Sequence, residues 1–113
     1  VMVRTMDHVL HHWNHKSTWG WDYPMMAMTA ARVGRGDWAV ESLLLDQTKN
    51  TYRPNGHNYQ SDRLPCYLPG NGGLLTTAAM MAAGWDGAPD RHAPGFPADG
   101  TWNVRHEGLQ RAP

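Results

Sequence analysis

The chain has 113 residues with ten basic and ten acidic side chains, enough for one modest domain with its own core. Because charge is balanced, no basic patch indicates a nucleic acid or an anionic membrane, and neither partner is expected. The single Cys66 excludes a disulfide framework and a CxxC metal pair, and no apolar run is long enough to cross a bilayer.

Residues 1–13 carry the pattern of a helix that is apolar on one side. No signal peptide is recognised, and a helical pattern from Val1 suggests part of a longer protein. The apolar stripe has the spacing i, i+3, i+4 and i+7, at Met6, Val9, Leu10 and Trp13. The opposite side holds two histidine pairs at i, i+4, which are His8/His12 and His11/His15. This spacing can hold a metal, but a solvated polar face explains it equally well, so no metal and no cofactor are expected.

Residues 24–33 predict a second helix, apolar on nearly every side and therefore buried. A polar and aromatic loop, residues 17–24, precedes this helix. Asp22 is a candidate helix cap, and Gly34 a candidate stop. A third, one-sided helix is expected over residues 38–45 with Asp37 as its cap. Its predicted stripe is Ala39, Val40, Leu43 and Leu44, with Glu41 and Ser42 facing outward.

The second half of the chain begins with a long loop, residues 50–75, rich in Asn, Gly, Pro and aromatic residues. It leads into a fourth helix, residues 74–83, which is again apolar all round, with Asn71 as its candidate cap. After Gly84 the sequence is rich in Pro and Gly, with one short strand expected over residues 101–105.

Helices that alternate between one-sided and buried predict an all-α fold. Residues 1–85 would form two helical hairpins packed in two concentric layers, and residues 86–113 an irregular tail packed on the same domain. Both buried helices start at a polar and aromatic loop, so the two loops should share one end of the core.

These loops hold the side chains that a sugar pocket needs. Aromatic faces pack on the C–H face of a pyranose, and amides, imidazoles and carboxylates bond its hydroxyls. The candidate residues are Trp19, Trp21, Asp22, Tyr52, Asn55, His57, Asn58 and Asn71. A phosphate site fits less well because GxxxxGK[ST] is absent.

Each candidate also has a purely structural interpretation. Trp19 and Trp21 could fill the core, and Asp22 could only cap a helix. His57 could be a structural hydrogen-bonding residue, and the glycines Gly70, Gly72 and Gly73 could serve a backbone turn and close packing.

Three segments together resemble a known family: residues 19–45, residues 50–60 and residues 67–85. They are similar to the C-terminal part of the catalytic domain of six-hairpin glycosidases, especially glycoside hydrolase family 95 and related bacterial glycosidases, over roughly residues 19–109. The resemblance implies the last two hairpins of an (α/α)6 toroid, a carbohydrate partner, and a periplasmic or extracellular location.

In that family the general acid is a glutamate upstream of this region, and the general base is an aspartate in a turn before the last inner helix. Here Pro69, which cannot accept a proton, stands at the position of the base. Asp22 is the candidate for a relocated base, with Asp62 as second choice. The sequence therefore predicts part of a glycoside hydrolase, with a non-catalytic carbohydrate-binding protein or a sister family of different layout as alternatives. A further alternative is a small helical interaction or metal protein built around the histidine side of residues 1–13.

Overall fold

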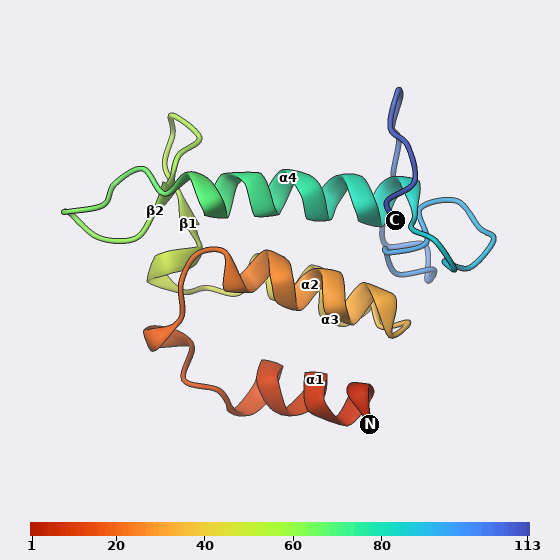
Figure 1. The fold of residues 1–113 in the computed structure, drawn as a ribbon, viewed down its shortest axis with the longest axis horizontal. Helices are drawn as coiled ribbons and strands as arrows, with labels where there is room; N and C mark the ends of the chain where they lie inside the picture. The colour runs from red at the N-terminus through yellow and green to blue at the C-terminus, as the bar shows by residue number, and fades with distance from the viewer.

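The computed structural model describes all residues from 1 to 113 and contains four α-helices and one small sheet (Figure 1). The helices are α1 (Met2–His12), α2 (Asp22–Arg32), α3 (Gly36–Leu44) and α4 (Leu68–Ala83). Short 3₁₀ turns, η1 (His15–Ser17) and η2 (Thr48–Asn50), and the strands β1 (Thr51–Tyr52) and β2 (Asn58–Tyr59) lie between them. No helix combines the length and the apolar character needed to cross a membrane.

Helix α2 is the centre of the fold. It packs against α1, α3 and α4, and its residues Tyr23, Ala27 and Ala30 have no exposed surface. Figure 1 shows α1, α2 and α4 as successive levels, with α3 overlapping α2 in this view. The prediction that the second helix is buried, and packs against the fourth, is confirmed.

The expectation of an all-α fold, a fragment of an (α/α)6 toroid, is wrong. Strands β1 and β2 form an antiparallel pair with Thr51 opposite Tyr59, so the domain mixes helices with a two-stranded sheet. Nor is α4 an inner helix buried all round, because Leu68 is 63% exposed and Leu75 is 72% exposed. The apolar sequence of residues 74–83 predicted burial on every side, but other parts of the chain cover only one face of α4.

The fourth helix also begins six residues earlier than predicted, at Leu68 instead of residue 74. Pro69 is tolerated because the first helical turn does not need its N–H group. Gly70 and Gly73 face other parts of the fold: a Cβ at Gly70 would lie 2.2 Å from Oδ1 of Asn58, and one at Gly73 would lie 2.8 Å from Cγ of Pro24. These glycines serve close packing inside a helix and do not form a turn.

Three smaller predictions for α3 are also wrong. Ser42 was expected to face outward but is completely buried, where its hydroxyl donates to the carbonyl of Trp38 at 2.7 Å. Leu44, expected in the buried stripe, is 69% exposed. Asp37 does not cap the helix with its side chain; it pairs with Arg35, and this hydrogen bond lowers the pKa of Asp37.

The segment after α4 lies against the end of the helical core opposite the long loop (Figure 1). The Gly95 N–H donates to the carbonyl of Met81, and the Ala112 N–H to that of Gly84. Residues 101–105 form no strand, so that prediction is wrong.

Candidate functional site

The two loops do meet at one end of the molecule, as the sequence predicted, and a group of hydrogen-bonded amides joins them. We call Asn58, Gln60 and Asn71 the amide network. Oε1 of Gln60 accepts the N–H of Gly20 at 2.8 Å, and Nε2 of Gln60 donates to Oδ1 of Asn58 at 2.9 Å. The backbone N–H of Asn58 in turn donates to Oδ1 of Asn71 at 2.9 Å.

Two of the predicted sugar-binding residues, Asn58 and Asn71, belong to this network. Nδ2 of Asn58 donates to the carbonyls of Lys49 and Thr51, both at 3.2 Å, and the residue has no exposed surface. Nδ2 of Asn71 donates to the carbonyl of Gly56 at 2.7 Å. The side-chain oxygens and nitrogens of Asn58 and Asn71 already have partners, so both residues hold the loops together, and the fully buried Asn58 does not face a ligand.

Gly20 lies between two tryptophans, Trp19 and Trp21, that point outward. It is buried beside the amide network, and a Cβ there would lie 2.0 Å from Oδ1 of Asn58. Trp19 and Trp21, on either side of it, are 48% and 55% exposed. They therefore do not fill the core. Trp19 lies beside Tyr67, with ring centroids 5.8 Å apart, and Nζ of Lys49 lies 4.5 Å from its ring centroid.

Asp22 is the first residue of α2 and does not cap it in the predicted way. Its Oδ2 turns back and accepts the N–H of Trp19 at 2.7 Å, while the Asp22 N–H donates to the carbonyl of Trp19 at 3.0 Å. This reciprocal pair closes the turn that presents Trp19.

Asparagine can accept the same bond, so Asp22→Asn should lower the free energy of unfolding by less than about 1 kcal/mol. Asp22→Ala, which removes the acceptor and the negative charge at the start of the helix, should lower it by about 1–3 kcal/mol. Urea denaturation of the two variants checks this difference. Equal losses would show that the bond to Trp19 does not stabilise the turn.

The remaining predicted residues lie in or beside the hairpin of β1 and β2. Tyr52 is half-buried and donates its hydroxyl to the carbonyl of Gly70 at 3.2 Å; burial raises the pKa of Tyr52, which keeps this donor protonated. Asn55 accepts the N–H of His57 at 3.1 Å at the exposed tip. Asp62, the second choice for a base, accepts the hydroxyl of Tyr59 at 2.9 Å, and this bond raises the pKa of Tyr59.

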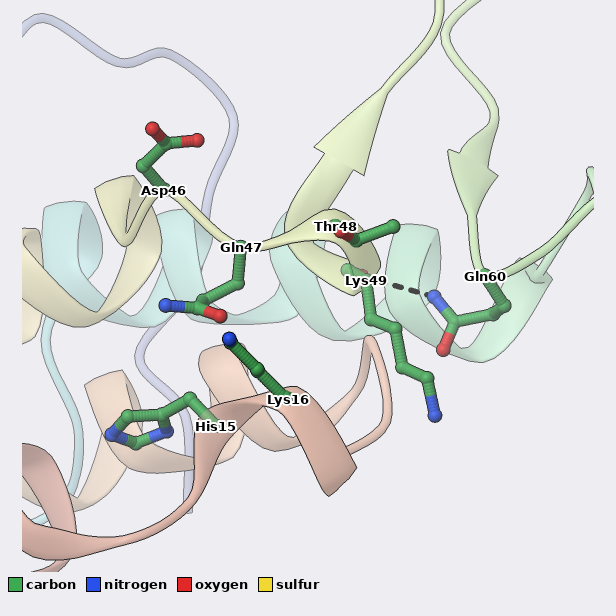
Figure 2. A pocket seen from close by; sticks show the side chains of 7 residues that line it. All are labelled: His15, Lys16, Asp46, Gln47, Thr48, Lys49 and Gln60. Atoms are coloured by element: carbon green, nitrogen blue, oxygen red, sulfur yellow. Dashed lines mark hydrogen bonds between the residues drawn. The ribbon is translucent and has the colours of Figure 1, made fainter.

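A polar pocket of about 540 Å³ adjoins this end of the domain and was not predicted. Its lining consists of residues 46–49 together with His15, Lys16 and Gln60, none of them hydrophobic (Figure 2). Nε2 of His15 lies 2.9 Å from the carbonyl of Leu10 and donates to it, whereas its buried Nδ1 has no partner. Lys49 lines the pocket and its ammonium group also lies over the Trp19 ring, so the pocket and the tryptophan turn adjoin each other and form one site.

The histidines of α1 do not gather into a metal site. His8 and His12 stack with ring centroids 4.9 Å apart, and His11 contacts Asp7 at 3.0 Å. The chain contains no group of three or more His, Cys, Asp or Glu side chains placed to hold a metal ion.

The sequence matches no protein-family model, and neither the curated proteins nor the solved structures include one that is significantly similar to it. The likeness to six-hairpin glycosidases therefore depends on its motifs alone. What defines this site is its geometry: two exposed tryptophans on a rigid turn, beside a polar pocket.

Proposed function

We propose that this end of the domain binds carbohydrate. The observation that carries the proposal is the outward position of Trp19 and Trp21, about half exposed on either side of the buried Gly20. Large aromatic surfaces kept in water are costly unless a ligand covers them, and a flat ring suits the apolar face of a sugar. Trp21 is the more open platform because no aromatic ring or cation lies against it.

The surroundings of the two tryptophans also support the binding of a sugar. Two hydrogen bonds hold the turn that bears them: the Gly20 N–H donates to Gln60 and the Trp19 N–H donates to Asp22. A fixed aromatic platform loses little conformational entropy when it binds. The adjoining pocket is lined by polar and charged residues, which suits the hydroxyls of a saccharide unit that extends beyond the aromatic surface.

Trp21→Ala should weaken binding of an oligosaccharide at least about tenfold, which corresponds to roughly 1.4 kcal/mol. Calorimetric titration with a panel of oligosaccharides measures this effect. Trp102→Ala is the matched control: Trp102 is 44% exposed and lies against one aromatic ring, Phe96, at the other end of the molecule. The proposal is contradicted if no saccharide binds or if both variants lose affinity equally.

Hydrolysis is the second candidate function, with Asp22 as the base, because its carboxylate lies in the same turn as the tryptophans. An inverting glycosidase needs a second carboxyl group about 6.5–9.5 Å away. Asp22→Asn separates the two functions: under binding alone, affinity stays within about twofold. A base at this position would instead cause a loss of hydrolysis by several orders of magnitude in a protein that supplies the acid.

A further inference from the structure

The two lysines of this chain line the same pocket. The eight other basic side chains are arginines, so Lys16 and Lys49 account for every ammonium side chain in the sequence. They come from segments 33 residues apart, each directly before one of the two loops that form the site. The fold brings both to the lining of one polar cavity of about 540 Å³, where the Lys16 side chain points toward Gln47 and the Lys49 side chain extends outward on the side of Gln60 (Figure 2).

Neither ammonium group is neutralised by a nearby acid. The ion pairs of the domain involve His11 and Arg35, and neither lysine has a carboxylate within 4 Å. Asp46 lies on the rim, but Figure 2 shows its carboxylate pointing away from Lys16 and Gln47. With two lysines against one aspartate, the lining of the pocket carries a net positive charge.

The other residues that line the pocket limit the class of ligand that can bind beside the lysines. Gln60 is already paired with Gly20, Lys49 and Asn58, so it forms the wall and is not a free ligand group. Figure 2 shows the Gln47 amide and the Lys16 ammonium directed toward each other across the cavity. The Lys16 and Lys49 ammonium groups are the cationic donors of this lining that have no carboxylate partner, and they favour an anionic oxygen.

We infer that the carbohydrate bound here is acidic, with its negative group held between Lys16 and Lys49 and its ring near Trp19. This inference rests on the proposed function. The negative group is a uronate carboxylate or a sulfate ester, since both offer several anionic oxygens to ammonium donors. A neutral sugar would cover the two ammonium groups without a counter-charge, which makes its binding less favourable.

Calorimetric titration with three trisaccharides of matched length tests the inference: a uronate, its neutral hexose counterpart and a sulfated hexose. We expect at least one acidic trisaccharide to bind about tenfold or more tightly than the neutral one, and to weaken as salt rises from about 20 mM to about 300 mM. The acidic trisaccharide that binds more tightly shows whether a carboxylate or a sulfate supplies the negative charge.

Lys16→Gln and Lys49→Gln should each remove most of this preference, measured as the ratio of the affinity for the acidic trisaccharide to that for the neutral one. Arg105→Gln is the control, because it makes the same charge change at an exposed residue of the C-terminal segment that has no ion pair. Circular dichroism confirms that each variant is folded before titration.

The outcomes separate this inference from the proposed function. Equal binding of neutral and acidic trisaccharides that still depends on Trp21 would overturn the acidic ligand and leave carbohydrate binding in place. A preference for acidic sugars that survives both lysine substitutions would also overturn it. If no trisaccharide binds, the proposed function itself fails.

Discussion

Gly70→Ala is expected to lower the free energy of unfolding by about 2–4 kcal/mol, whereas Gly72→Ala, two residues later in the same helix, should raise it by about 0.5–1 kcal/mol. A Cβ at Gly70 would lie 2.2 Å from Oδ1 of Asn58, while one at Gly72 would meet no atom within 4 Å. Asn58 cannot move aside cheaply because its side-chain bonds would break. Alanine at residue 72 simply favours the helix.

Urea denaturation followed by circular dichroism measures both changes. The paired design matters because both substitutions add the same methyl group to α4 and differ only in what surrounds it. If residues 68–73 belonged to a loop, as the sequence predicts, the two variants would change stability by similar amounts. Opposite signs are the result that supports a helix beginning at Leu68 and packed on the amide network.

Asn58→Ala should lower the free energy of unfolding by about 3 kcal/mol or more, because it leaves several buried groups without partners. The carbonyl of Thr51 would lose its Asn58 donor, and Nε2 of Gln60 would lose its side-chain acceptor. The substitution should also release the Trp19–Trp21 turn, because Gln60 holds Gly20 only while Gln60 itself is held in place.

Asn55→Ala is the matched control for Asn58→Ala. It removes the same side chain from the exposed tip of the same hairpin, where it accepts one hydrogen bond from His57. Asn55→Ala should lower the free energy of unfolding by less than about 1 kcal/mol. Thermal unfolding compares the two variants, and a smaller effect at Asn58 than at Asn55 would contradict the structural role of the amide network.

The parts of the fold with clear periodicity were predictable. The helical pattern of residues 1–13 corresponds to α1, and the all-round apolar character of residues 24–33 marked α2 as the centre of the core. The start of α4 was not predictable, since glycine and proline ordinarily favour turns. Tertiary contacts at Gly70 and Gly73 override that preference, and nothing local in the sequence shows those contacts.

The candidate site was predictable in location and only partly in its residues. Two polar and aromatic loops before buried helices indicated one shared end, and the structure brings them together there. Asn58 and Asn71 looked like sugar ligands because an amide has the same chemistry whether it bonds a hydroxyl or a backbone carbonyl. Lys16 and Lys49 were missed, although the position of the only two lysines, directly before the two loops, was a signal in the sequence.

The measurement that tests the account most directly follows the six tryptophan indole N–H signals by NMR while an oligosaccharide is added. The account predicts that the signals of Trp19 and Trp21 shift with saturable dependence on ligand, and that the signal of Trp102 stays unchanged. It would be contradicted if no indole signal moved with any neutral or acidic saccharide, or if Trp102 shifted as much as Trp21.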